Sequence, residues 1–107
     1  AAISMHARIS VITLGVDDLE RSVKFYRDGL GFATQGIVGK EFESGAVAFF
    51  ELSGGLRLAL WPRKSIAHDS GLALAMPSAT EITLGHNVMS RTEVDQVMQQ
   101  AAESVIN

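Results

Sequence analysis

The fold is decided by Ile9–Phe32, which reads ISVITLGVDDLERSVKFYRDGLGF. Its first part alternates apolar residues with small or polar ones, the period-two pattern of a half-buried strand. Asp17 is predicted to cap a following helix, with Glu20 three residues later completing a capping box. Gly29 and Gly31 supply the backbone freedom that ends the helix. One helical face is made by apolar residues at three- and four-residue steps: Leu19, Val23 and Tyr26.

Three more strands are expected after this helix. Phe32–Val38 is predicted to be a short strand, and Gly36 within it indicates an edge or a bulge. Ala46–Leu52 is apolar between turn residues and is predicted to be a buried strand. Ser53–Gly55 forms a tight turn, and Leu56–Trp61 alternates again. The order strand, helix and three strands predicts an α+β fold.

The opening pattern returns near the C-terminus. Residues 82–88 alternate as a strand would, and Val88 stands where Val16 stood, 72 residues earlier. Ser90 and Glu93 form a second capping box. The next apolar helical face contains Val94, Val97, Met98 and Ala101. We therefore expect a repeated unit whose second copy is incomplete in this sequence.

The chain is accordingly divided into three parts. Residues 1–62 form the first module, residues 63–80 are a linker, and residues 81–107 begin a second module with a strand and a helix. Within the linker, residues 72–76 are apolar enough for a short strand. The strands that complete the second module are expected in further sequence or on another chain, because an open sheet leaves backbone groups unpaired.

Composition narrows the classes of function. The 107 residues suffice for one small domain with a core. The net charge is −3 and the charges are interspersed, which argues against a nucleic-acid partner. The sequence contains no cysteine, so thiolate chemistry and disulfides are excluded. It shows neither an apolar run of membrane-spanning length nor a secretory leader, and a cytoplasmic location is expected.

These patterns resemble a known family. The residues that carry the likeness are Val16–Leu19, Ser22, Phe25–Tyr26 and Gly29–Phe32. They resemble the vicinal oxygen chelate superfamily, which includes glyoxalase I, extradiol dioxygenases, and fosfomycin- and bleomycin-resistance proteins. The resemblance implies βαβββ modules that pair, often across a homodimer, around a cleft for a small organic molecule. Residues 82–97 look like the start of the second module.

The resemblance also implies where a metal would bind. Metal-dependent members place a His or Gln on the first strand of each module and a Glu on the last. The matching positions here are Val11, Thr83 and Ala59, of which only Thr83 has any donor, a weak neutral one. We therefore expect no metal or other cofactor. A register error of one residue would bring His86 or Glu51 into consideration instead.

Strand parity indicates which side chains line the cleft. Trp61 is either a stacking platform for a flat ligand or a filler between modules. Arg57 either clamps an anion or makes an exposed ion pair, and Glu51 is either a general base, if buried, or a solvated carboxylate. Phe49 suits the core as well as the cleft. The candidate ligand-binding residues are Thr13, Phe49, Glu51, Arg57, Trp61, Thr83 and Asn87.

Three hypotheses follow. The first is a protein that binds a small organic molecule in an aromatic cleft without a metal, similar to the bleomycin-resistance type. The second is a glyoxalase-like, metal-dependent lyase or isomerase. The third is a module whose partner is another protein chain and whose cleft is vestigial. The sequence alone leaves open whether any reaction is catalysed.

Overall fold

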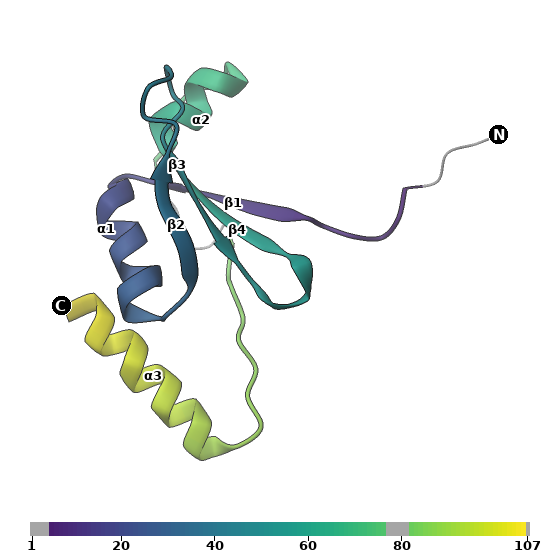
Figure 1. The fold of residues 1–107 in the computed structure, drawn as a ribbon, viewed down its shortest axis with the longest axis vertical. Helices are drawn as coiled ribbons and strands as arrows, with labels where there is room; N and C mark the ends of the chain where they lie inside the picture. The colour runs from purple at the N-terminus through teal and green to yellow at the C-terminus, as the bar shows by residue number, and fades with distance from the viewer. Residues whose placement is uncertain (1–4, 77–81, 107) are drawn as a thin grey trace.

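The computed structural model describes residues 5–76 and 82–106 (Figure 1). Its sheet has four strands, β1 (Val11–Val16), β2 (Ala33–Val38), β3 (Val47–Glu51) and β4 (Arg57–Pro62). Their order is β1-β4-β3-β2, with β1 parallel to β4 and the other neighbours antiparallel. One helix separates β1 from β2, so the predicted α+β class and βαβββ order are confirmed.

The core lies between the sheet and the first helix. Helix α1 (Leu19–Lys24) runs directly into one π-helical turn, Phe25–Gly29. Aromatic rings extend the core, and the Tyr26 and Phe50 ring centroids are 5.7 Å apart. Burial raises the pKa of Tyr26, because its charged form would lose hydration. The buried residues of this core are Leu19, Val23, Ala48, Phe50, Leu58 and Leu60.

The cap of α1 differs from the prediction by one residue. Asp18, not Asp17, is the N-cap, and its Oδ1 accepts a hydrogen bond from the Arg21 backbone N–H at 3.1 Å. Strand pairing extends to Val16, so the chain reaches a helical conformation only at Leu19. Asp17 instead forms an ion pair with Arg63, with 3.2 Å between Oδ1 and Nη1.

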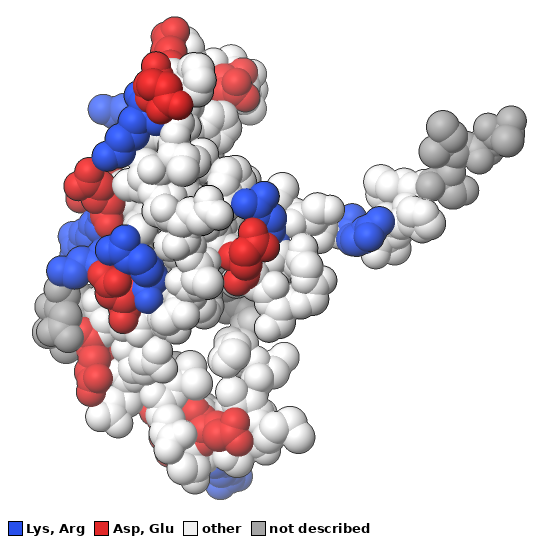
Figure 2. Space-filling model, viewed as in Figure 1, with Lys and Arg blue, Asp and Glu red and all other residues white. Residues whose placement is uncertain are grey.

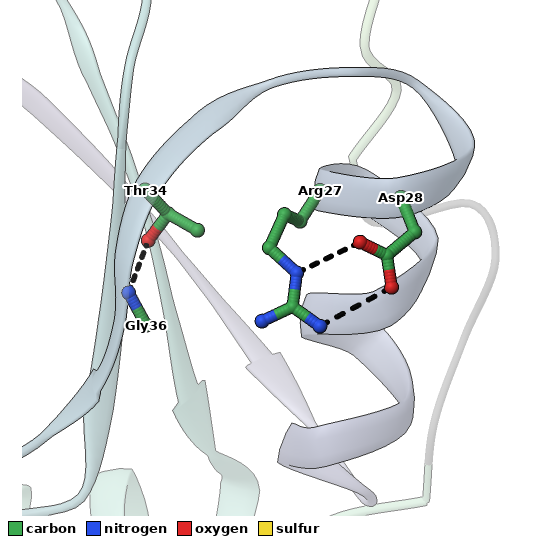
Figure 3. Close-up of polar contacts among 4 residues, drawn as sticks. All are labelled: Arg27, Asp28, Thr34 and Gly36. Atoms are coloured by element: carbon green, nitrogen blue, oxygen red, sulfur yellow. Dashed lines mark hydrogen bonds and ion pairs between the residues drawn. The ribbon is translucent and has the colours of Figure 1, made fainter.

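The expected irregularity at Gly36 is a bulge in β2. The pairing with β3 shifts between Thr34 and Ile37, and Gly36 has a φ of +90°, which glycine tolerates best. Thr34 Oγ1 accepts a hydrogen bond from the Gly36 N–H at 3.1 Å (Figure 3). The same hydroxyl donates to the Phe49 carbonyl at 2.6 Å. The bulge is therefore tied to β3 by one side chain.

Figure 3 also shows the end of the π-helical turn, where Arg27 donates to both carboxylate oxygens of Asp28, at 2.9 and 3.2 Å. These hydrogen bonds lower the pKa of Asp28. Both side chains of this pair are about half exposed.

The predicted linker contains a helix, α2 (Arg63–Ser70). It follows Pro62 directly and ends at Gly71, whose φ is +71°. Proline before a helix and glycine after it are the usual boundary signals, and they were present in the sequence. Residues 72–76, which were apolar enough for a strand, have no regular secondary structure.

The predicted strand over residues 82–88 is absent, because no strand among the described residues pairs with this segment. The predicted helix is present as α3 (Arg91–Ile106), and Ser90 Oγ accepts from the Glu93 N–H at 3.2 Å. This helix lies beside the π-helical turn (Figure 1), where the Gln100 side chain donates to the Gly29 carbonyl at 2.9 Å. Its predicted apolar face is half covered: Val97 and Ala101 are partly buried, whereas Val94 and Met98 are exposed.

Among the described residues, no helix combines the length and apolar character needed to cross a membrane.

Candidate functional site

The sheet face opposite α1 presents three cross-strand rows. Strand pairing places Arg57 between Val11 and Glu51, and Ala59 between Thr13 and Phe49. The third row pairs Trp61 with Gly15. Because same-face residues alternate along a strand, these side chains share the side that the helix does not cover. The predicted parity of β4 is correct, since Leu58 and Leu60 are buried on the helix side.

Two cavities lie on this face. One, of about 290 Å³, is mainly apolar and includes Thr13, Val47, Ala59 and Trp61 in its lining. The other, of about 270 Å³, is bordered by Arg57, Glu51 and the bulged part of β2. Phe49 lines both. The face therefore offers an aromatic compartment beside a charged one.

Trp61 is held by the loop between β2 and β3. Its Nε1–H donates to the Ser44 carbonyl at 2.9 Å, which satisfies the polar group of the indole. The two sides of this loop approach closely at Gly39 and Gly45, so that a Cβ at Gly39 would clash with the carbonyl of Gly45. Ser44 and Gly45 also line the aromatic cavity. The ring is thereby fixed in place while still lining the cavity.

Arg57 contacts both an acid and an aromatic ring. Its Nε lies 2.8 Å from Glu51 Oε1, and its guanidinium carbon lies 4.4 Å from the centroid of the Phe49 ring. The Arg57 and Glu51 side chains are 45% and 64% exposed. Glu51 therefore lacks the burial that a general base would need, and its observed role is an exposed ion pair.

The structure brings five of the predicted residues together on one face: Thr13, Phe49, Glu51, Arg57 and Trp61. It does not bring the other two there. Thr83 and Asn87 lie exposed in the segment before α3, outside the sheet, and their role stays a prediction. His86, which a one-residue register error would have made a candidate metal ligand, is also exposed in that segment.

Sequence reasoning missed the loop residues Ser44 and Gly45 and the Gln35 side chain, which lines the charged cavity. Ser44 and Gly45 lie in a loop without a periodic pattern, and nothing local in the sequence of either segment places these residues beside Trp61 or Arg57. Figure 2 shows acidic and basic side chains interspersed on the visible face, without an extended patch of either sign.

The donor set does not fit the metal centre that the family resemblance implies. Val11 and Ala59 occupy the two positions of this module that the resemblance assigns to metal ligands, and both are hydrocarbon side chains. Ala59 is 2% exposed at the floor of the aromatic cavity. Across residues 5–76 and 82–106, no three His, Cys, Asp or Glu side chains converge where they could hold an ion. A metal would need ligands from elsewhere.

Several solved structures are similar to this chain. A glyoxalase-related enzyme from Fulvimarina pelagi is 32% identical, with a TM-score of 0.73 over 92% of this chain and 66% of that one. A glyoxalase/bleomycin resistance protein/dioxygenase from Nocardioides is 25% identical, with a TM-score of 0.68 over 95% and 64%. The fosfomycin resistance protein FosX from Listeria monocytogenes shares the fold at 21% identity, with a TM-score of 0.55 over 94% and 67%.

The chain thus spans slightly less than two thirds of the first two of these structures. A comparison with curated proteins gives no significant match. Residues 8–107 match the family described as Glyoxalase/Bleomycin resistance protein/Dioxygenase superfamily. That match covers nearly the whole chain, and it agrees with the βαβββ order of the strands and helix. The chain belongs to the glyoxalase/bleomycin resistance protein/dioxygenase superfamily.

Proposed function

We propose that this chain binds a small organic molecule in the aromatic cleft of its sheet, without a metal, in the manner of a bleomycin-resistance-type protein. The observation that carries the proposal is the pairing of Trp61 and Phe49 around the floor residue Ala59, at the position that the family resemblance assigns to a metal ligand. The methyl side chain at that position leaves room for a flat ligand and has no donor atom that could coordinate an ion.

The size and polarity of the cleft support this proposal. Small-molecule sites are mostly apolar, with a few polar groups, and run from about 300 to 1,000 Å³. The aromatic cavity of about 290 Å³ lies near the lower end, and the charged cavity adjoins it at Phe49. Because the Trp61 N–H is already bonded to Ser44, a ligand meets an indole with no unpaired polar group.

The test is a ligand screen read through tryptophan fluorescence. Trp61 is the single tryptophan, so a saturable change reports the cleft directly. Hits are then measured by calorimetry in Trp61→Ala, which is expected to lose binding while keeping its fold. Met98→Ala, an exposed change on α3, is the matched control and should leave binding unchanged. Saturable binding that survives in Trp61→Ala would move the ligand elsewhere.

The alternative, a metal-dependent lyase or isomerase, requires ligands that this module does not supply at Val11 and Ala59. Elemental analysis of dialysed protein separates the two. A divalent ion retained at one equivalent per chain would overturn the metal-free proposal.

We also propose a homodimer in the cytoplasm. The free edge of β1 supports the dimer, because among the described strands β1 pairs only with β4, and Ile9 beside it is 69% exposed. Sedimentation should give a dimer that Ile9→Lys weakens, and a monomer at high concentration would refute the assembly. The absence of cysteine is compatible with a reducing compartment.

A further inference from the structure

We infer, on the basis of the proposed function, that the preferred ligand is a planar organic anion. Its flat apolar part lies on the aromatic compartment around Trp61, Phe49 and Ala59. Its carboxylate, or a similar charged group, binds Arg57. This goes beyond a generic small molecule by naming the chemistry at each end.

The two compartments set the shape of the ligand. Phe49 lines both cavities, so a molecule lying beside this ring reaches the Trp61 side and the Arg57 side together. Arg57, Ala59 and Trp61 are successive same-face residues of β4. Such residues repeat every ~6.6 Å along a strand, so the backbone positions of Arg57 and Trp61 are roughly 13 Å apart. The two side chains extend toward each other and shorten this distance, so that two fused rings carrying an acid group fit between them.

The sign of the charge follows from where Arg57 lies. Its guanidinium carbon lies 4.4 Å from the centroid of the Phe49 ring, and its Nε lies 2.8 Å from Glu51 Oε1. A ligand that extends along Phe49 out of the aromatic compartment therefore comes to lie beside the cation. A guanidinium has about five N–H donors, and the contact to Glu51 is made through Nε. Donors remain for the planar oxygens of a carboxylate.

Glu51 acts as an exchangeable counterion. Its side chain is 64% exposed, and that of Arg57 is 45% exposed, so water and salt weaken their attraction. An incoming carboxylate that is already held by ring contacts replaces this weak partner at little cost. Removing the Glu51 charge should then strengthen binding of an anion.

The experiment compares 2-naphthoate with 2-naphthamide by calorimetry, because the two share their rings and differ in charge. The anion is expected to bind about tenfold more tightly. Arg57→Gln should remove that preference and leave the amide unchanged, and Glu51→Gln should tighten the anion alone. Arg57→Lys keeps the charge without the fork and should fall between. Met98→Ala is the control, and thermal melting checks that each variant folds.

Each outcome is decisive. Equal affinity for the two probes, unchanged in Arg57→Gln, overturns the anion inference while the proposed cleft stands. Weaker anion binding in Glu51→Gln also overturns it, because the counterion would then be helping. Tighter binding of 2-naphthylmethylamine than of 2-naphthoate assigns recognition to Glu51 instead. Failure of all three probes to bind, when the fluorescence screen still gives a saturable ligand, overturns the inference alone; failure of the screen as well overturns the proposed function.

Discussion

The hydroxyl of Thr34 makes hydrogen bonds with two backbone groups. Its removal should lower both the stability of the fold and the affinity of the cleft for a ligand. The hydroxyl donates to the Phe49 carbonyl at 2.6 Å and accepts from the Gly36 N–H at 3.1 Å. Thr34→Val keeps the shape and removes both hydrogen bonds. An unsatisfied buried group costs about 1–3 kcal/mol, but this site is only partly buried, so we expect a total of about 1–2 kcal/mol.

The assay is urea and thermal unfolding followed by circular dichroism. For a domain of this size, the expected loss corresponds to a fall in Tm of about 5–15 °C. Thr34→Ser is the matched control, because it keeps the hydroxyl and should retain most of the stability. Phe49 lines both cavities, so Thr34→Val should also weaken ligand binding in the cleft.

Equal stability of the Val and Ser variants would refute this reasoning. It would mean that water hydrogen-bonds to the Gly36 N–H and the Phe49 carbonyl as well as the hydroxyl does, and that Thr34 does not hold Phe49 in place. A stability loss without any change in binding would refute only the link from the bulge to the cleft.

Three further predictions concern the core, the cap and pH. Leu60→Ala should destabilise the fold by about 2–5 kcal/mol in urea unfolding, because Leu60 is 0% exposed. A loss below about 1 kcal/mol would contradict its place in the core. Asp18→Ala should cost about 0.5–2 kcal/mol through the lost cap, whereas Asp17→Ala should cost less, because its ion pair is exposed; the reverse order would restore Asp17 as the cap. Burial raises the pKa of Tyr26 above its unfolded value of about 10, so its contribution to stability is complete below that pH and is lost as the pH rises through the folded pKa. The free energy of unfolding, measured at a series of pH values from 9 to 12, should therefore fall less steeply with pH in Tyr26→Phe than in the parent protein. Equal slopes would show that Tyr26 contributes nothing to this pH dependence.

Local patterns predicted correctly which residues of β4 face away from the core. The alternation of Arg57, Ala59 and Trp61 with Leu58 and Leu60 was sufficient to assign the two faces of β4. Side chains on a strand alternate with a strict period of two, so a buried face identifies the open one without knowledge of the partners. The glycine inside the predicted strand indicated an edge or a bulge, and β2 is both the edge strand of the sheet and bulged at Gly36, where φ is positive.

Boundaries between elements were less predictable. Asp17 and Asp18 are equally good caps by residue type, and only the pairing of Val16 with Pro62 decides between them. Helix α2 was signalled by Pro62 and Gly71, but its polar composition resembled a linker. Such errors arise because the helix propensity of single residues predicts helix boundaries poorly where tertiary contacts determine them.

The sequence by itself determined the βαβββ order of the first module, the composition of the core and the residue types available to the cleft. Only the tertiary structure decided that Ser44 holds Trp61, that Arg57 lies over Phe49, and that residues 82–88 stay outside the sheet. The physical reason is the distance along the chain between the residues that interact. Periodicity reports burial of a side chain on its own element, whereas hydrogen bonds and strand pairing join residues far apart in the chain.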